Sequence, residues 1–148
     1  MNKDVKILVS EGDNECFTLI TKSFHKAGIW NEIVRFADKG EMLNYLLEKD
    51  GDFVREENKK YLLLIDVHKP DLNGFSVLEK IKEDKELRKI PVIILTNYDN
   101  GEFVERCHSF GCNLFLVKPE EPEEFMESVK KIGLFLSVVR FPRINGVK

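Results

Sequence analysis

Three polar residues, each placed directly after four consecutive apolar residues, are suited to phosphoryl transfer. They are Asp66, Thr96 and Lys118. A carboxylate can attack phosphorus as a nucleophile. A threonine hydroxyl can donate a hydrogen bond to a phosphoryl oxygen, and an ammonium can neutralise charge on the transferring group. These residue types therefore predict phosphoryl chemistry, provided that the fold brings them to one place.

Two further acids follow the first apolar segment of the chain. Glu11 and Asp13 come after residues 6–10 and are separated by Gly12. Carboxylate oxygens are ligands that Mg²⁺ prefers, and bound Mg²⁺ keeps several waters. Asp13 has two open interpretations: it turns inward as a ligand, because Gly12 permits unusual backbone angles, or it caps the following helix.

The apolar pattern alternates between strands and helices five times. Strands are expected at residues 6–10, 32–37, 62–65, 91–96 and 113–118, and amphipathic helices follow each of them. Strands that are apolar on both faces are typical of parallel sheets. The alternation predicts an α/β fold, a doubly wound five-stranded parallel sheet with helices on both faces and right-handed crossovers. The carboxyl ends of such strands share one edge, where open α/β sheets place their chemistry.

Length, charge and composition narrow the class of protein. A chain of 148 residues is long enough for one domain with a substantial core. Its net charge of −3 argues against broad binding to nucleic acid, so no DNA partner is expected. No apolar run approaches the ~20 residues that span a bilayer, and the start shows no signal-peptide pattern. The three cysteines lack metal-ligand spacing and are expected to be reduced thiols in a cytoplasmic protein.

Three motifs resemble the receiver domain of two-component response regulators. They are Asp66-Val-His-Lys-Pro70 with Gly74, the strand that ends in Thr96, and Phe115-Leu-Val-Lys118-Pro119. The resemblance implies the flavodoxin-like receiver fold with strand order 2-1-3-4-5. It also implies a receiver domain over residues 1–133, followed at residues 134–148 by an extension of the last helix and a tail.

The resemblance also assigns roles to the residues. Asp66 would accept a phosphoryl group from a sensor histidine kinase, Thr96 and Lys118 would read that group, and Phe115 would be an aromatic switch or a plain core residue. Mg²⁺ would be held by carboxylates and one carbonyl; the set is Glu11, Asp13, Asp66 and the backbone carbonyl of His68. Receivers usually have two adjacent acids after the first strand, and Gly12 replaces the second here. Weakened metal binding is therefore expected.

A second resemblance, to small stand-alone receivers that work with bacterial phytochromes, rests on the charged segment 50–60 and the apolar tail. It implies a homodimer through the face made by the fourth helix, fifth strand and fifth helix. The tail suits a partner surface, or it folds back onto its own domain.

The leading interpretation is a single-domain receiver that signals by protein–protein contact, with an unidentified downstream partner and no membrane partner. It is not an enzyme in the ordinary sense, although self-dephosphorylation is expected.

Three other functions remain as alternatives. Gly12 favours a degenerate receiver that acts as an interaction module without phosphorylation. A flavin-binding protein of the same topology would need a phosphate-cradling loop after the first strand, and the acidic residues 11–15 would repel phosphate. An aspartate-nucleophile phosphatase would need a second acid two residues after Asp66, where His68 stands.

Overall fold

The computed structural model of the protein contains one five-stranded parallel sheet with strand order β2-β1-β3-β4-β5. It describes residues 3–47, 58–67, 72–96, 101–118 and 121–145, with side chains for all of these except 72–75. The predicted α/β class, the strand order and the parallel pairing are confirmed. The strands are β1 (Lys6–Ser10), β2 (Ile33–Phe36), β3 (Tyr61–Asp66), β4 (Val92–Thr96) and β5 (Leu114–Val117).

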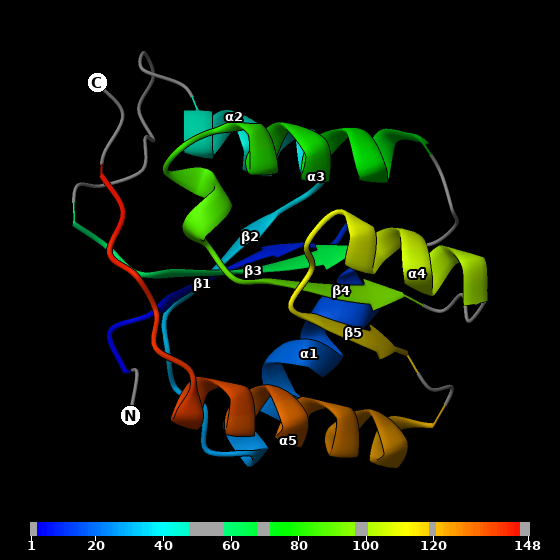
Figure 1. Ribbon diagram of the computed structural model, residues 1–148. Helices are drawn as coiled ribbons and strands as arrows, with labels where there is room; N and C mark the ends of the chain where they lie inside the picture. Colours follow the sequence, from blue (N-terminus) through cyan, green and yellow to red (C-terminus); the bar gives the residue numbers. More distant parts are fainter. Residues whose placement is uncertain (1–2, 48–57, 68–71, 97–100, 119–120, 146–148) are drawn as a thin grey trace.

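Helices cover both faces of the sheet (Figure 1). On one face lie α1 (Asn14–Lys26) and α5 (Pro122–Val138); on the other lie α2 (Lys39–Leu47), α3 (Leu72–Glu83) and α4 (Gly101–Ser109). A short 3₁₀ helix, η1 (Leu87–Lys89), was not predicted. It begins where Asp84 Oδ1 accepts hydrogen bonds from the backbone N–H groups of Glu86 and Leu87, both at 2.9 Å.

The core consists of two layers because alternate residues of each strand point to opposite faces. In β3, Leu63 and Ile65 pack with α2, α3 and α4, whereas Leu62 and Leu64 pack with α1 and α5. Every residue of β3 is buried. This two-sided burial explains why the strand is a continuous apolar run.

Glycine ends two of the helices, as the sequence predicts. Gly28 follows α1 with φ +81°, and Gly111 follows α4 with φ +84°. A glycine adopts this left-handed conformation without the steric cost of a Cβ. The chain can therefore turn after α1 and after α4 and continue into β2 and β5.

The C-terminal tail folds back on its own domain. After α5 the chain passes the amino ends of the strands (Figure 1). Phe141 packs edge-on against Phe135, with ring centroids 5.8 Å apart, in the α1/α5 layer. Ile144 is buried in the opposite layer and forms a two-hydrogen-bond bridge, its N–H donating to Lys59 and its carbonyl accepting from Asn58. Of the two interpretations left open for the tail, residues 139–145 therefore adopt the intramolecular one.

Within the ranges given above, no helix combines the length and the apolar character needed to cross a bilayer. The predicted charged loop lies mostly at residues 50–57, outside those ranges.

Candidate functional site

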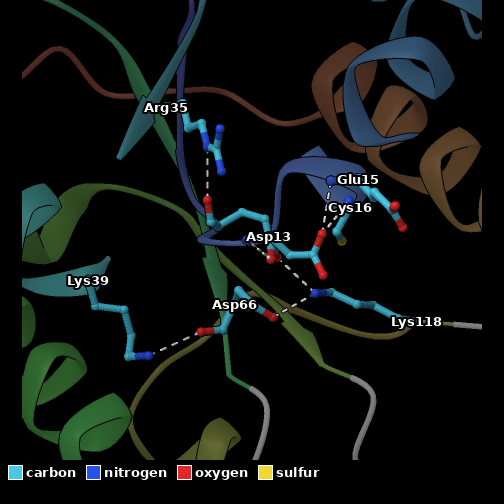
Figure 2. Close-up of polar contacts among 8 residues, drawn as sticks. Asp13, Glu15, Cys16, Arg35, Lys39, Asp66 and Lys118 are labelled. Atoms are coloured by element: carbon cyan, nitrogen blue, oxygen red, sulfur yellow. Dashed lines mark hydrogen bonds and ion pairs between the residues drawn. The ribbon is translucent and has the colours of Figure 1, made fainter. Parts of the chain in front are cut away.

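Lys118 joins two carboxylates at the carboxyl edge of the sheet (Figure 2). Its Nζ donates to Asp66 Oδ1 at 2.7 Å and to Glu11 Oε2 at 2.8 Å. The three residues come from the ends of β5, β3 and β1, which lie far apart in the chain. Glu11 and Asp66 are buried and Lys118 is partly buried, with 11% of the Lys118 side chain, 7% of Asp66 and none of Glu11 exposed.

Thr96 lies at the same edge, between the strands that carry Asp66 and Lys118. Asp66 pairs with Leu95 in the β3–β4 register, which places Thr96 one residue beyond it. The backbone N–H of Lys118 donates to the Thr96 carbonyl, and the Thr96 side chain is fully buried. The parallel register thus brings the three sequence-predicted residues Asp66, Thr96 and Lys118 to one edge.

The charges of this cluster perturb one another. Burial raises the pKa of Asp66 to about 6; Lys118 opposes this rise and the neighbouring Glu11 carboxylate adds to it. Burial also acts against charged Glu11, but the hydrogen bond and charge of Lys118 outweigh it and lower the pKa of Glu11. Burial acts against the charge of Lys118, and its hydrogen bonds to Asp66 and Glu11 more than compensate, so that its pKa rises. Lys118 therefore stays cationic, and Asp66 is the carboxylate that takes a proton first on acidification.

Asp13 serves as the N-cap of α1. Its Oδ1 accepts hydrogen bonds from the backbone N–H groups of Glu15 at 2.8 Å and Cys16 at 3.2 Å (Figure 2). Its own N–H donates to Glu11 Oε1 at 3.1 Å. Gly12 does not adopt the positive φ that would have helped Asp13 to turn inward. Across the described ranges, no three His, Cys, Asp or Glu side chains form a group that could hold a metal ion.

The capping geometry gives a test of what Asp13 does. Replacing Asp13 with alanine should cost about 1 kcal/mol of unfolding free energy, because two N–H groups of α1 lose their acceptor. Asparagine should retain most of that stability, because its side-chain oxygen can also cap. Urea unfolding of both variants measures this. Equal losses for alanine and asparagine would show that the charge of Asp13, and not its capping bond, is what stabilises the fold.

Of two other residues predicted for the site, the structure describes Phe115 but not His68. Phe115 is half-buried and packs edge-on against Phe103 of α4, with ring centroids 5.8 Å apart. The contact joins β5 to α4. It is expected both of a plain core residue and of an aromatic switch. His68, whose carbonyl was predicted as a metal ligand, lies outside the described residues, as do Pro70 and Pro119.

Two basic residues at this edge were not singled out by the sequence. Arg35 Nε donates to the Glu11 carbonyl at 2.9 Å, and the guanidinium carbon lies 4.9 Å from the centre of the Phe17 ring. Lys39 Nζ donates to the Asp66 carbonyl at 3.3 Å (Figure 2). A single basic residue at a strand end or helix start has no distinctive spacing, so no sequence signal could have identified either.

Comparison with known proteins points in one direction. A family model described as the response regulator receiver domain matches residues 7–130. A curated relative, the probable methanogenesis regulatory protein FilR2 of Methanothrix harundinacea, is 30% identical over 126 residues, which cover 85% of this chain and 79% of FilR2.

Solved structures agree with this match. A response regulator receiver domain from Rhodospirillum rubrum superposes with a TM-score of 0.83 at 35% identity, covering 96% of this chain and all of that one. The phosphorylated cyanobacterial phytochrome response regulator RcpA superposes with a TM-score of 0.80 at 27% identity, covering 93% of this chain and 98% of RcpA.

Proposed function

Because this chain belongs to the family of response regulator receiver domains, we propose that it is a cytoplasmic protein whose Asp66 accepts a phosphoryl group from a sensor histidine kinase. The observation that carries the proposal is the position of the Lys118 ammonium, 2.7 Å from the Asp66 carboxylate at the edge of the sheet. A lysine held there by two buried carboxylates provides positive charge where a transferred phosphoryl group would sit.

The transfer uses Asp66 in its ionised form. A carboxylate oxygen forms a bond to phosphorus while the bond from phosphorus to the donor imidazole nitrogen breaks, and that electron pair stays on the nitrogen. With a pKa of about 6, Asp66 is mostly ionised at neutral pH. Lys118 and the Thr96 hydroxyl then contact the phosphoryl oxygens, because Lys118 Nζ lies 2.7 Å from the Asp66 carboxylate and Thr96 ends the strand next to β3.

Receiver domains typically bind Mg²⁺. Here the residues fit such an ion in part. Glu11 and Asp66 would hold it together with the backbone carbonyl at position 68, while Asp13, proposed from sequence as another ligand, has Oδ1 engaged as a helix cap. When bound, the ion would neutralise charge on the phosphoryl group. Weak Mg²⁺ affinity follows from this reduced set of ligands.

Phosphorylation is proposed to act on partners through the α4–β5–α5 face. The added charge of about −1.5 to −2 lies next to Thr96, and Phe115 packs on Phe103 of α4. A coupling of ~1–3 kcal/mol is typical for such two-state faces. The same face would form the homodimer, and the signal would pass on by contact with a protein partner. Hydrolysis by water removes the phosphoryl group from Asp66, and no separate substrate is turned over.

Incubation with acetyl phosphate and Mg²⁺ tests the proposal. The intact mass should increase by one phosphoryl group, and the Asp66→Asn variant should show no increase because its amide is not a nucleophile. Asp38→Asn is the matched control, since it removes an exposed carboxylate that caps α2 and should leave phosphorylation unchanged. A phosphoryl group that persists on Asp66→Asn would contradict the assignment.

The second candidate is a degenerate receiver that binds partners without phosphorylation. Gly12 and the capping role of Asp13 favour it, because together they remove carboxylates from the metal site. No mass increase of the native protein, in acetyl phosphate with saturating Mg²⁺, would support this second candidate.

A further inference from the structure

We propose that Lys39 supplies a fixed positive charge at the phosphoacceptor site, which makes the site depend less on a divalent cation. The inference rests on the proposed function, because it concerns the charge that meets a phosphoryl group on Asp66. It arises from a basic residue that neither the motifs nor the comparisons assign to the site.

The ammonium of Lys39 lies at the end of β3. Its Nζ donates to the backbone carbonyl of Asp66 at 3.3 Å, whereas Lys118 Nζ meets the Asp66 carboxylate at 2.7 Å. In the close-up the two lysines approach Asp66 from opposite sides (Figure 2). Asp66 therefore has one cation at its carboxylate, Lys118, and a second at its backbone carbonyl, Lys39.

Lys39 comes from a segment that is held firmly against the loop after β1. The Glu11 N–H donates to the Phe36 carbonyl at 3.1 Å, and Arg35 Nε donates to the Glu11 carbonyl at 2.9 Å. A Cβ added at Gly12 would lie 3.1 Å from the Ala37 carbonyl oxygen, which is closer than ordinary contact. The segment that delivers Lys39 thus packs closely over the position where receivers usually have their second acid.

The position of Lys39 is unfavourable for α2 itself. Lys39 is the first residue of the helix, where the positive end of the dipole disfavours a cation. The start of α2 is otherwise well formed: Asp38 Oδ1 accepts from the Glu41 N–H at 2.9 Å, and Glu41 Oε2 accepts from the Ala37 N–H at 3.1 Å. A residue that breaks a local rule in a well-formed element is expected at functional sites.

The charge balance shows what Lys39 changes. Glu11 and Asp66 bring two negative charges, and Lys118 and Lys39 bring two positive charges, so these four side chains sum to zero. A carboxylate at position 12 in place of glycine, without Lys39, would leave two negative charges for a divalent cation to neutralise. The observed set attracts Mg²⁺ less strongly and accepts an anionic phosphoryl group more readily.

Magnesium titration by calorimetry measures this charge effect without phosphorylation. Lys39→Met should bind Mg²⁺ about 3–10-fold more tightly than the native protein, because a nearby like charge is removed. Lys39→Arg should retain the native affinity, because it keeps the charge. Lys131→Met removes an exposed lysine from α5, away from the site, and should not change the affinity.

Acetyl phosphate with EDTA provides the second measurement. The native protein and Lys39→Arg should keep part of their phosphorylation rate without metal, and Lys39→Met should lose it. A Lys39→Met variant that binds Mg²⁺ no more tightly than the native protein overturns the inference. If the Mg²⁺ affinity shifts as expected while no variant accepts a phosphoryl group, the role of Lys39 stands and the proposed function fails.

Discussion

Replacing Lys118 with methionine is expected to lower the unfolding free energy by about 3–5 kcal/mol at about pH 8. The ammonium is the hydrogen-bond partner of two buried carboxylates, Asp66 and Glu11. Methionine fills a similar volume but leaves both negative charges buried next to each other. The native stability of such domains is about 5–15 kcal/mol, so the variant should be folded but marginal. Urea unfolding followed by circular dichroism measures the loss.

The pH dependence of this loss identifies its cause. Without Lys118 the two carboxylates repel each other, so one of their pKa values should rise further. Their protonation at about pH 5 then relieves the repulsion, and the variant should recover most of its stability there. Lys130→Met is the matched control, because it breaks an exposed ion pair with Glu127 and should cost under about 0.5 kcal/mol. A loss that is equal at both pH values would mean that packing, and not charge, explains the effect.

Asp66→Asn is expected to stabilise the fold by about 1–3 kcal/mol at about pH 8. Burial raises the pKa of Asp66 from 3.8 to about 6. In that window the folded state binds a proton more readily than the unfolded state, so the contribution of Asp66 to stability falls as the pH rises through it. Above the window the ionised carboxylate remains a fixed cost, which asparagine removes while its side-chain oxygen still accepts from Lys118.

The sign of this effect is checked by repeating the unfolding experiment in acid. At about pH 4 Asp66 is protonated in the folded state, and the gain from asparagine should nearly disappear. Asp13→Asn is the control, since it neutralises an exposed carboxylate and retains a capping oxygen. A variant that is less stable than the native protein at about pH 8 would show that the Asp66–Lys118 ion pair outweighs the burial cost. If asparagine raises the unfolding free energy as expected, the native Asp66, the proposed phosphoacceptor, lowers the stability of the fold.

The sequence predicted the framework of the site because that framework depends on periodicity. The bounds of β1, the glycines that end α1 and α4, and the inward residues of α5 were all predicted and are confirmed. The parallel strands predicted that Asp66 and Lys118 lie at one edge, and the strand order implied by the resemblance placed them close together there. The functional roles of these residues stay predictions for the experiments described above.

What the sequence could not give depends on side chains that meet across loops. Asp13 satisfied two patterns equally, and only the backbone at Gly12 decided in favour of the cap. Lys39 and Arg35 reach the site through contacts between β2, α2 and the loop after β1, which leave no periodic trace. The tail was ambiguous because apolar residues suit a partner or the domain's own core equally well. Burial of Ile144 against the α2/α3 layer resolved this.

The returning tail has a consequence for building hybrid signalling proteins. Phe141 packs in the core layer of α1 and α5, while Ile144 packs in the layer of α2 and α3. The short segment 139–145, called the strap below, therefore contributes a side chain to each layer of the core. A fusion joined at residue 130, where the family match ends, would remove the second half of α5 and the strap, opening two voids at the amino edge of the sheet. A junction placed after residue 145 would keep these two contacts and leave the edge that carries Asp66 and Lys118, at the other end of the strands, unchanged.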